Sequence, residues 1–280
     1  FDFAAKYGPY EDWRDARRHY ALKVKMGARL PKKGQNEDSR PEDSFKFLPW
    51  NPLLSRGLLK RYPQTTEEAV LLCGGKQAKY PPKGGTINYV VLFGCYGPEL
   101  LDAPPRGYAC VPAGPAPIHV FAGEGNPPKQ LTKMVKGRSG LVGNHGLNRL
   151  RDAEIVYKVE GLSDMLALQA LIPPELRDKH VVITNASGAG ELTLPSEVAP
   201  VFADKDVVII HDADKPGQDG VQLWLHAIGN GIAGSVRNLV LYEEIAETKG
   251  KDLRDWISDG HAYADLFALV EQTPSISATQ

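Results

Sequence analysis

The sequence predicts an α/β protein whose C-terminal half holds a mostly parallel sheet with flanking helices, preceded by a smaller mixed α+β subdomain. After residue 151, short apolar strands alternate with helical stretches, as expected for a sheet that is covered on both faces. Between residues 86 and 122, β-rich runs are separated by Gly and Pro, which indicates a small sheet. We therefore expect a basic α+β subdomain over 1–150, the alternating domain over 151–260, and a C-terminal helix and tail over 261–280.

The elements of the first subdomain follow from its apolar pattern. Residues 10–25 carry an apolar stripe at helical spacing, whereas 29–44 have almost nothing apolar to bury and predict an exposed loop. A helix is expected over 53–61, and Thr65 with Glu68 suggests a capping box for a second helix that Gly74-Gly75 ends. Three runs are expected as strands: INYVVLFGCYG, GYACVPAG and PIHVFAG. A basic, Gly-rich connector is expected over 126–150.

The second domain shows the alternation more regularly. Strands are expected over 154–160, 180–185, 206–212 and 236–242. Helices are expected over 162–171, 195–203, 218–229 and 262–271. In such sheets the functional site lies at the C-terminal ends of the strands.

Composition limits the cellular setting and the chemistry. No run of 18 apolar residues is present, and the first residues lack the basic start and apolar stretch of a signal peptide, so we expect a cytoplasmic protein without a membrane span. The chain begins at Phe1, and we expect a fragment or a processed product. The three cysteines form no CxxC pair, which argues against zinc in this chain and favours packed thiols.

Charge is distributed unevenly along the chain. Residues 1–150 hold 23 Lys/Arg against 13 Asp/Glu, a net +10, and residues 151–280 hold 10 against 21, a net −11. A basic half beside an acidic half suits a protein that grips a polyanion with one part and holds cations with the other. Solvated faces also differ in charge by chance, so this asymmetry alone is weak evidence.

Carboxylates follow the ends of the predicted parallel strands. Glu160 closes the first strand, Asp164 lies one helical turn later, and Asp212 closes the third strand with Asp214 two residues on. Asp252 follows the fourth strand. Clustered carboxylates repel unless a cation offsets them, and oxygen ligands without His or Cys select Mg²⁺ or Mn²⁺. Each motif alone also fits an ordinary turn, a solvated surface or a helix cap; their order after buried strands favours a metal site.

These segments resemble the TOPRIM family. VEGLSDMLAL, DVVIIHDADKPGQDG and KDLRDW are similar to its strand ending in Glu-Gly, its DxD followed by Gly, and its further Asp, over about residues 151–260. The resemblance implies Glu160 as the catalytic acid or base and Asp212, Asp214, Asp252 and Asp164 as metal ligands. Pro216 stands where primases of the family usually have a small residue, and we expect it to tighten the turn.

The residues before 151 help to separate the members of the family. The chain has no room for topoisomerase domains, no four-cysteine zinc site and no GxxxxGK[ST] motif, and its order of elements most resembles the catalytic core of a bacterial or phage-type DNA primase. That resemblance implies RNA primer synthesis on single-stranded DNA from nucleoside triphosphates, with Mg²⁺ or Mn²⁺, and a replicative helicase as a possible partner. A TOPRIM nuclease and a non-catalytic nucleic-acid-binding module remain alternatives.

Nucleotide or template contacts are expected from basic side chains and one Gly-rich turn. Gly188 lies in NASGAG after the second strand, where backbone amides can meet a phosphate, although an ordinary strand-to-helix turn explains the glycines equally well. A plain solvated role is as compatible with each basic residue as a phosphate contact is. The basic candidates are Lys133, Lys136, Arg138 and Lys215.

Overall fold

The computed structural model describes residues 45–80, 88–114, 119–120, 129–130, 133–229 and 231–276. The chain divides into two compact units, Phe1–Arg40 and Pro41–Gln280, and every described residue belongs to the second. The first unit contains the helix expected over 10–25 and most of the loop expected over 29–44. Both predicted segments lie entirely outside the described residues.

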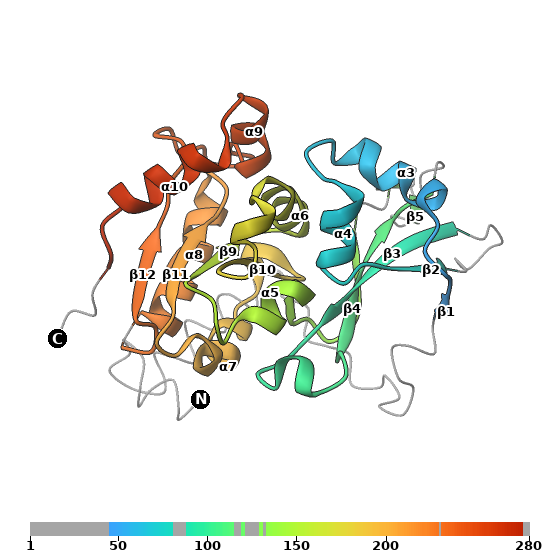
Figure 1. The fold of residues 1–280 in the computed structure, drawn as a ribbon, viewed down its shortest axis with the longest axis horizontal. Helices are drawn as coiled ribbons and strands as arrows, with labels where there is room; N and C mark the ends of the chain where they lie inside the picture. Colours follow the sequence, from blue (N-terminus) through green and yellow to red (C-terminus); the bar gives the residue numbers. More distant parts are fainter. Residues whose placement is uncertain are drawn as a thin grey trace. The chain divides into compact units, whose positions relative to one another are not determined.

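The first sheet is antiparallel throughout, in the order β1-β2-β3-β4-β7. Its strands are β1 (Lys46–Phe47), β2 (Lys76–Tyr80), β3 (Asn88–Cys95), β4 (Gly107–Pro112) and β7 (Met134–Gly137). Helices α3 (Pro52–Arg61) and α4 (Glu67–Leu72) accompany this sheet (Figure 1). Leu58 of α3 and Val70 of α4 belong to the same buried cluster as Val91 and Phe93 of β3, so both helices cover one face of it.

The second sheet has the order β12-β11-β9-β10-β8 and is parallel except at one edge. Its parallel strands are β9 (Ile155–Val159), β10 (His180–Asn185), β11 (Asp206–Ile210) and β12 (Ser235–Asn238). The edge strand β8 (Leu141–Val142) pairs antiparallel with β10. β9 lies between β10 and β11, so it pairs with a strand on each side. Its five residues are also largely buried, which explains its almost continuous apolar run.

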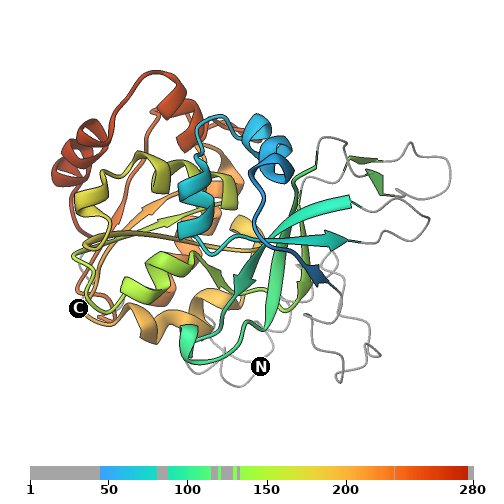
Figure 2. The same cartoon turned by 45° about the vertical axis from the view of Figure 1, so that its right-hand side comes forward.

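Helices cover both faces of the second sheet. They are α5 (Asn144–Arg149), α6 (Leu162–Leu171), α7 (Leu194–Val198), α8 (Lys215–Ile228), α9 (Leu253–Ser258) and α10 (Tyr263–Gln272). Tyr157 and Val159 of β9 join a cluster with α6, α9 and α10, whereas Val156 joins a second cluster with α7 and α8. The alternation of side chains along one strand thus assigns each helix to its face. The arrowhead of β12 points to the side where α9 and α10 lie (Figure 1), and Figure 2 shows these two C-terminal helices in red from another angle.

Short elements complete the described fold. The two-stranded ribbon consists of β5 (His119–Val120) and β6 (Lys129–Gln130). The 3-10 turns are η2 (Leu100–Asp102), η3 (Pro174–Leu176), η4 (Gly188–Gly190) and η5 (Ala199–Phe202). A buried hydrogen-bonded group ties α10 to the second sheet: the hydroxyl of Tyr263 lies 2.8 Å from that of Tyr157 and 2.5 Å from Nδ1 of His180.

This architecture confirms the predicted fold class, a mixed α/β protein with one mostly parallel sheet, flanking helices and a second sheet that precedes it. Four expectations about elements were wrong. The strand expected over 236–242 ends at Asn238, so a long connection separates it from Asp252. The basic connector expected over 126–150 contains β7, β8 and α5, because β7 completes the first sheet and β8 the second. The helix cap is Thr66, whose side chain accepts from the amide of Ala69, and not Thr65, which is buried. The helix expected over 195–203 is divided into α7 and η5.

All three cysteines are buried free thiols, as expected for packed side chains. Burial raises the pKa of Cys95 and of Cys110 to about 12, so these thiols stay protonated and unreactive. Among the helices that the structure describes, none combines the length and the apolar character needed to cross a membrane.

Candidate metal and nucleotide site

Glu160 and Asp212 lie next to each other because their strands are neighbours. Glu160 follows β9 directly, Asp212 lies two residues beyond β11, and these two strands pair in parallel register. The amide of Asp212 donates to Oε2 of Glu160 at 3.1 Å. A Cβ at Gly217 would stand 2.4 Å from the carbonyl oxygen of Asp212 and 3.0 Å from Oε2 of Glu160, so this position has no room for a side chain.

Asp212 is the electrostatic centre of the acidic edge. Burial, followed by the charges of Glu160, Asp164, Asp252 and Asp214 in that order, raises its pKa to about 8. The pKa of Glu160 is raised by burial as well, with a further contribution from Asp214. The sheet edge therefore gathers more negative charge than it can hold as ionised carboxylates, which is the situation a divalent cation relieves.

Asp214 has a structural role in addition to any role as a ligand. It is the N-cap of α8, where its Oδ1 accepts from the amide of Gly217 at 2.8 Å and its Oδ2 accepts from the amide of Gly250 at 3.1 Å. Pro216 stands in the first turn of α8, where its fixed φ and missing N–H cost nothing. The first turn of α8 therefore accommodates Pro216, and its effect on metal binding stays a prediction.

Asp164 and Asp252 are joined by an arginine. Arg254 Nε donates to Oδ1 of Asp164 at 3.1 Å, and its Nη2 donates to Oδ2 of Asp252. Asp252 is also the N-cap of α9 in a capping box with Asp255. Burial, followed by the charge of Asp252, raises the pKa of Asp164 to about 7, although Arg254 acts in the opposite direction. Arg254 lies inside the KDLRDW motif, and its link to two carboxylates was not predicted from the sequence.

A second residue that the sequence analysis missed is Lys158, which is fully buried in β9. Its Nζ donates to the carbonyl of Val159 at 2.7 Å, lies 3.5 Å from Nε2 of His211 and stands 4.7 Å from the ring centroid of Trp224. Burial lowers its pKa to about 7, while the charges of Glu160 and Asp164 act to raise it. The available signal was a lysine inside the apolar run IVYKV, since buried lysines are rare without a nearby acid.

The basic residues expected to contact nucleotide or template are separated by the fold. Lys133 is half-buried, and the charges of Asp164 and Glu160 raise its pKa against the larger effect of burial, so it lies within electrostatic reach of the acidic edge. Lys136 stands opposite Tyr108 in the β4–β7 pair, with its Nζ 5.8 Å from the ring of Tyr80. Arg138 is exposed and lies 3.6 Å from Glu197.

The two remaining candidates flank α8. Lys215 begins α8 with its side chain 66% exposed, and its ammonium lies 3.9 Å from Glu247. Gly188 has φ +71°, and a Cβ there would meet nothing within 4 Å, so the turn is open at this point. Asn185 Nδ2 donates to the carbonyl of Gly188 at 2.8 Å, which leaves the ordinary turn and the phosphate contact both compatible with this glycine.

The donor chemistry of the acidic edge fits a hard divalent cation, because every ligand that it offers is a carboxylate oxygen. Within the part of the chain that the structure describes, no three His, Cys, Asp or Glu side chains converge closely enough to hold a metal as they stand. Both oxygens of Asp214 accept a backbone amide, yet a carboxylate oxygen has a second lone pair for a metal.

Solved structures to which this chain is similar include structures of primases. The primase fragment of the bacteriophage T7 primase-helicase protein is 15% identical, with 88% of this chain and 85% of that chain covered and a TM-score of 0.50. The zinc-binding and RNA polymerase domains of the Aquifex aeolicus primase are 16% identical, with 92% and 57% covered and a TM-score of 0.46. A bacteriophage T7 complex of lagging-strand DNA polymerase with primase domains bound to an RNA/DNA hybrid and dTTP gives 16% identity, 76% and 89% coverage and a TM-score of 0.47.

The likeness to the T7 fragment shows a primase-like fold for most of this chain. No family model matches the chain, and no curated protein matches its sequence. The TOPRIM resemblance therefore stays a prediction from the motifs, and the functions of individual residues have to be argued from the site itself.

Proposed function

We propose that this protein synthesises RNA primers on single-stranded DNA by metal-assisted nucleotidyl transfer between nucleoside triphosphates. The observation that carries the proposal is the set of carboxylates within electrostatic range of Asp212, namely Glu160, Asp164, Asp252 and Asp214. These acids come from the ends of two neighbouring parallel strands and from the first turns of three helices. The primase-like fold supports the same reaction class.

In this proposal Glu160 acts on the attacking 3′-hydroxyl as a general base. Its pKa is raised by burial, which brings it nearer to the operating pH, where a base is most effective. The hydrogen bond from the amide of Asp212 to Oε2 of Glu160 holds this carboxylate beside the end of β11 and fixes its orientation. No other acid of the group is held by a neighbouring strand in this way among the residues described.

Mg²⁺ or Mn²⁺ would be held by Asp212 and Asp214, with Asp252 as a further ligand. When bound, such an ion neutralises triphosphate charge and aligns the attacking and leaving oxygens. Asp252 is shared with Arg254, so this arginine sets the orientation of that carboxylate. Asp164 is buried and paired with Arg254, and we assign it a positioning role through the arginine in addition to the ligand role expected for it.

Two lysines balance the charge of the site in different ways. Lys133 is half-buried within reach of Asp164 and Glu160, and we propose that it contacts the incoming triphosphate. Lys158 is fully buried and donates to the carbonyl of Val159, the residue before Glu160, so we propose that it holds the end of β9 in place. Gly188, Lys136, Arg138 and Lys215 remain candidates for template or nucleotide contact.

A primer-synthesis assay tests the proposal. Wild-type protein, unlabelled single-stranded template and labelled nucleoside triphosphates should give short RNA products with Mg²⁺ or Mn²⁺ and none with EDTA. Glu160→Gln should reduce the rate by about 100-fold or more, the usual contribution of a general base. Glu175→Gln removes one exposed carboxylate outside the site and should leave the rate unchanged.

The same assay separates the alternatives. Strand cleavage with metal and no nucleoside triphosphates would replace the proposal with a nuclease. Template binding without either reaction would leave a non-catalytic module. The proposed partners are single-stranded DNA, nucleoside triphosphates and a replicative helicase, in the cytoplasm. The similar T7 fragment comes from a protein named a primase-helicase, which supports the proposal of a helicase partner.

A further inference from the structure

The first sheet is free of acidic residues along all five of its strands. Its strands contain four lysines and no Asp or Glu: Lys46, Lys76, Lys79 and Lys136. Pairing divides them between the two faces, because Lys76 lies opposite Leu92 and Lys136 lies opposite Tyr108. Leu92 and Tyr108 belong to the cluster on the face away from α3 and α4. Two lysines therefore share this outer face with aromatic side chains.

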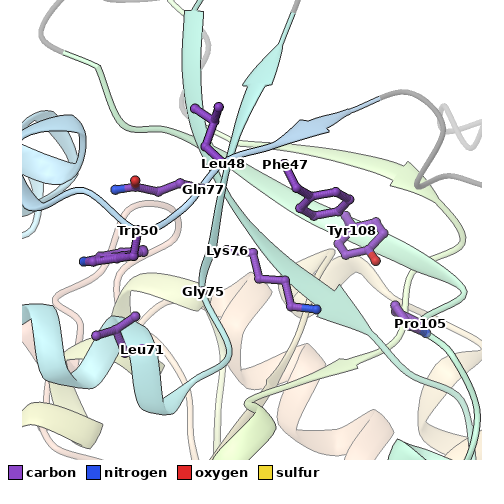
Figure 3. A pocket seen from close by; sticks show the side chains of 9 residues that line it. All are labelled: Phe47, Leu48, Trp50, Leu71, Gly75, Lys76, Gln77, Pro105 and Tyr108. Atoms are coloured by element: carbon purple, nitrogen blue, oxygen red, sulfur yellow. The ribbon is translucent and has the colours of Figure 1, made fainter.

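A pocket of about 510 Å³, here termed the aromatic pocket, lies beside β2 where this outer face meets α4, and its lining includes Lys76 from the outer face and Leu71 from α4. Figure 3 shows Phe47 and Tyr108 on one side of the Lys76 side chain and Trp50 and Leu71 on the other. Phe47 is 40% exposed and packs edge-on against the buried Tyr108, with ring centroids 6.1 Å apart. The volume lies within the range of small-ligand sites.

The polar side chains of Gln77 and Trp50 in the pocket already form hydrogen bonds within the protein, which leaves few for a ligand. Gln77 Oε1 accepts from the amide of Asn51 at 2.7 Å, and its Nε2 donates to the carbonyl of Asn51 at 2.8 Å. The indole Nε1 of Trp50 donates to Glu67. The pocket therefore offers a ligand mainly aromatic ring faces and the exposed ammonium of Lys76, which lies 6.0 Å from the ring centroid of Phe47.

This combination suits a flat ring that carries a nearby anion. Aromatic faces with adjacent cations bind unpaired bases by stacking, without selecting a sequence. A smaller hollow shares Lys76, Pro105 and Tyr108 with the aromatic pocket and extends to Asn144 at the start of α5. Lys136 stands by Tyr80 on the same sheet face and offers a second cation for a neighbouring phosphate.

We infer that the aromatic pocket binds one unpaired base of single-stranded nucleic acid, with Phe47 as the stacking platform and Lys76 at its phosphate. The inference rests on the proposed function, whose template is single-stranded DNA, and assigns to that template a contact on the first sheet. The carboxylates of the second sheet take no part in this contact.

Fluorescence anisotropy in EDTA, without nucleoside triphosphates, tests the inference. The probes are a labelled oligothymidylate and a strand of the same length made of abasic residues. Phe47→Ala should weaken oligothymidylate binding roughly 5- to 100-fold, the effect of losing one base stack, and leave the abasic strand unchanged. Phe47→Leu keeps an apolar contact with Tyr108 but lacks the ring, and it should show the same selective loss.

Lys76→Ala should weaken both strands and flatten the dependence of log affinity on log salt by about 0.7, the value for one phosphate. Leu53→Ala, an exposed apolar residue on α3, is the matched control and should change neither strand. Unchanged oligothymidylate binding by both Phe47 variants would overturn the inference. Equal loss on the abasic strand would do the same.

Sedimentation of the same variants gives a further outcome. If Phe47→Ala changes the association state of the protein and not its oligothymidylate affinity, the pocket is an interface between copies and the inference is wrong. Failure here leaves primer synthesis and its acidic residues untouched. Conversely, loss of the proposed function in the catalytic assay would not affect a binding result obtained in EDTA.

Discussion

The two sheets of this protein bring functional side chains together by different geometric means. In the parallel sheet, Glu160 and Asp212 meet at one edge because β9 and β11 run in the same direction and end side by side. In the antiparallel sheet, neighbouring strands end at opposite edges, and side chains meet across a face, as Tyr108 of β4 and Lys136 of β7 do. The first geometry concentrates charge at a point, and the second spreads lysines and rings over a surface.

The difference also appears in how each sheet bears its charges. The acidic edge is electrostatically strained, since Asp212 and Asp164 have pKa values raised to about 8 and about 7. The outer face of the first sheet places Lys76 and Lys136 over aromatic rings and has no opposing carboxylate on its strands. Thus the charges of the acidic edge suit a cation, and those of the outer face suit a polyanion.

The largest expected effect is the loss of primer synthesis when the carboxylates of the acidic edge are replaced. The double variant Asp212→Asn, Asp214→Asn should lower primer synthesis by about 100-fold or more, because it removes two carboxylates proposed to hold metal. Single-strand affinity in EDTA should stay within twofold of wild type, since the basic sheet is unchanged. Rates from labelled-nucleotide incorporation, beside anisotropy on the same preparation, provide the check. Wild-type activity in the double variant would remove the site assignment.

Metal should stabilise the acidic edge selectively. Mg²⁺ or Mn²⁺ at ten times its dissociation constant adds about 1.4 kcal/mol to the free energy of unfolding, by mass action on the folded state. Thermal unfolding with and without metal measures this gain. The gain should vanish in Asp212→Asn and persist in Glu175→Gln. Stoichiometric zinc in the purified protein would contradict the oxygen-ligand assignment.

The two acids of the DxD pair should differ in sign when stability is measured without metal. Asp212→Asn should raise the melting temperature, because it removes a carboxylate that four others repel. Asp214→Asn should lower the free energy of unfolding by about 1 kcal/mol, since an amide oxygen cannot replace both carboxylate oxygens that cap Gly217 and Gly250. A change of that size moves the melting temperature by about 2–4 °C. Equal shifts in both variants would refute this distinction.

The smallest expected effect is a pH dependence of stability in EDTA. Asp212, Asp164 and Glu160 have folded-state pKa values above their ordinary ones, so the folded protein holds more protons than the unfolded chain between about pH 4 and 7. Their contribution is fully present below pH 4 and is lost as the pH rises through 7 to 8. Lys158, with a pKa lowered to about 7, acts in the opposite direction above pH 7.

Urea unfolding between pH 5 and 7 isolates the acidic contribution. The slope of the free energy of unfolding against pH should be less negative in Asp212→Asn than in wild type, because one of the three groups no longer titrates. The Glu175→Gln variant should keep the wild-type slope. A slope that is identical in all three proteins would mean that the acidic edge does not govern stability in this range.

Much of the second domain could be predicted because its signals are local. Apolar strands and Gly-bounded turns set β9, α6, β10 and α10 within one or two residues of their expected limits. The order of Glu160, Asp212 and Asp214 after buried strands placed three carboxylates at one edge, since parallel strands end on the same side. By itself the sequence determined the fold class and this acidic edge.

Only the tertiary structure decided which residues meet across distant segments. Arg254 links Asp164 to Asp252 because α9 packs beside α6, a pairing that no spacing in the sequence encodes. Lys133 and Lys136 are three residues apart, yet Lys133 lies within electrostatic range of Asp164 and Glu160, whereas Lys136 lies on the outer face of the first sheet. Strand pairing fixes these environments, and pairing depends on the burial of whole faces rather than on local propensity.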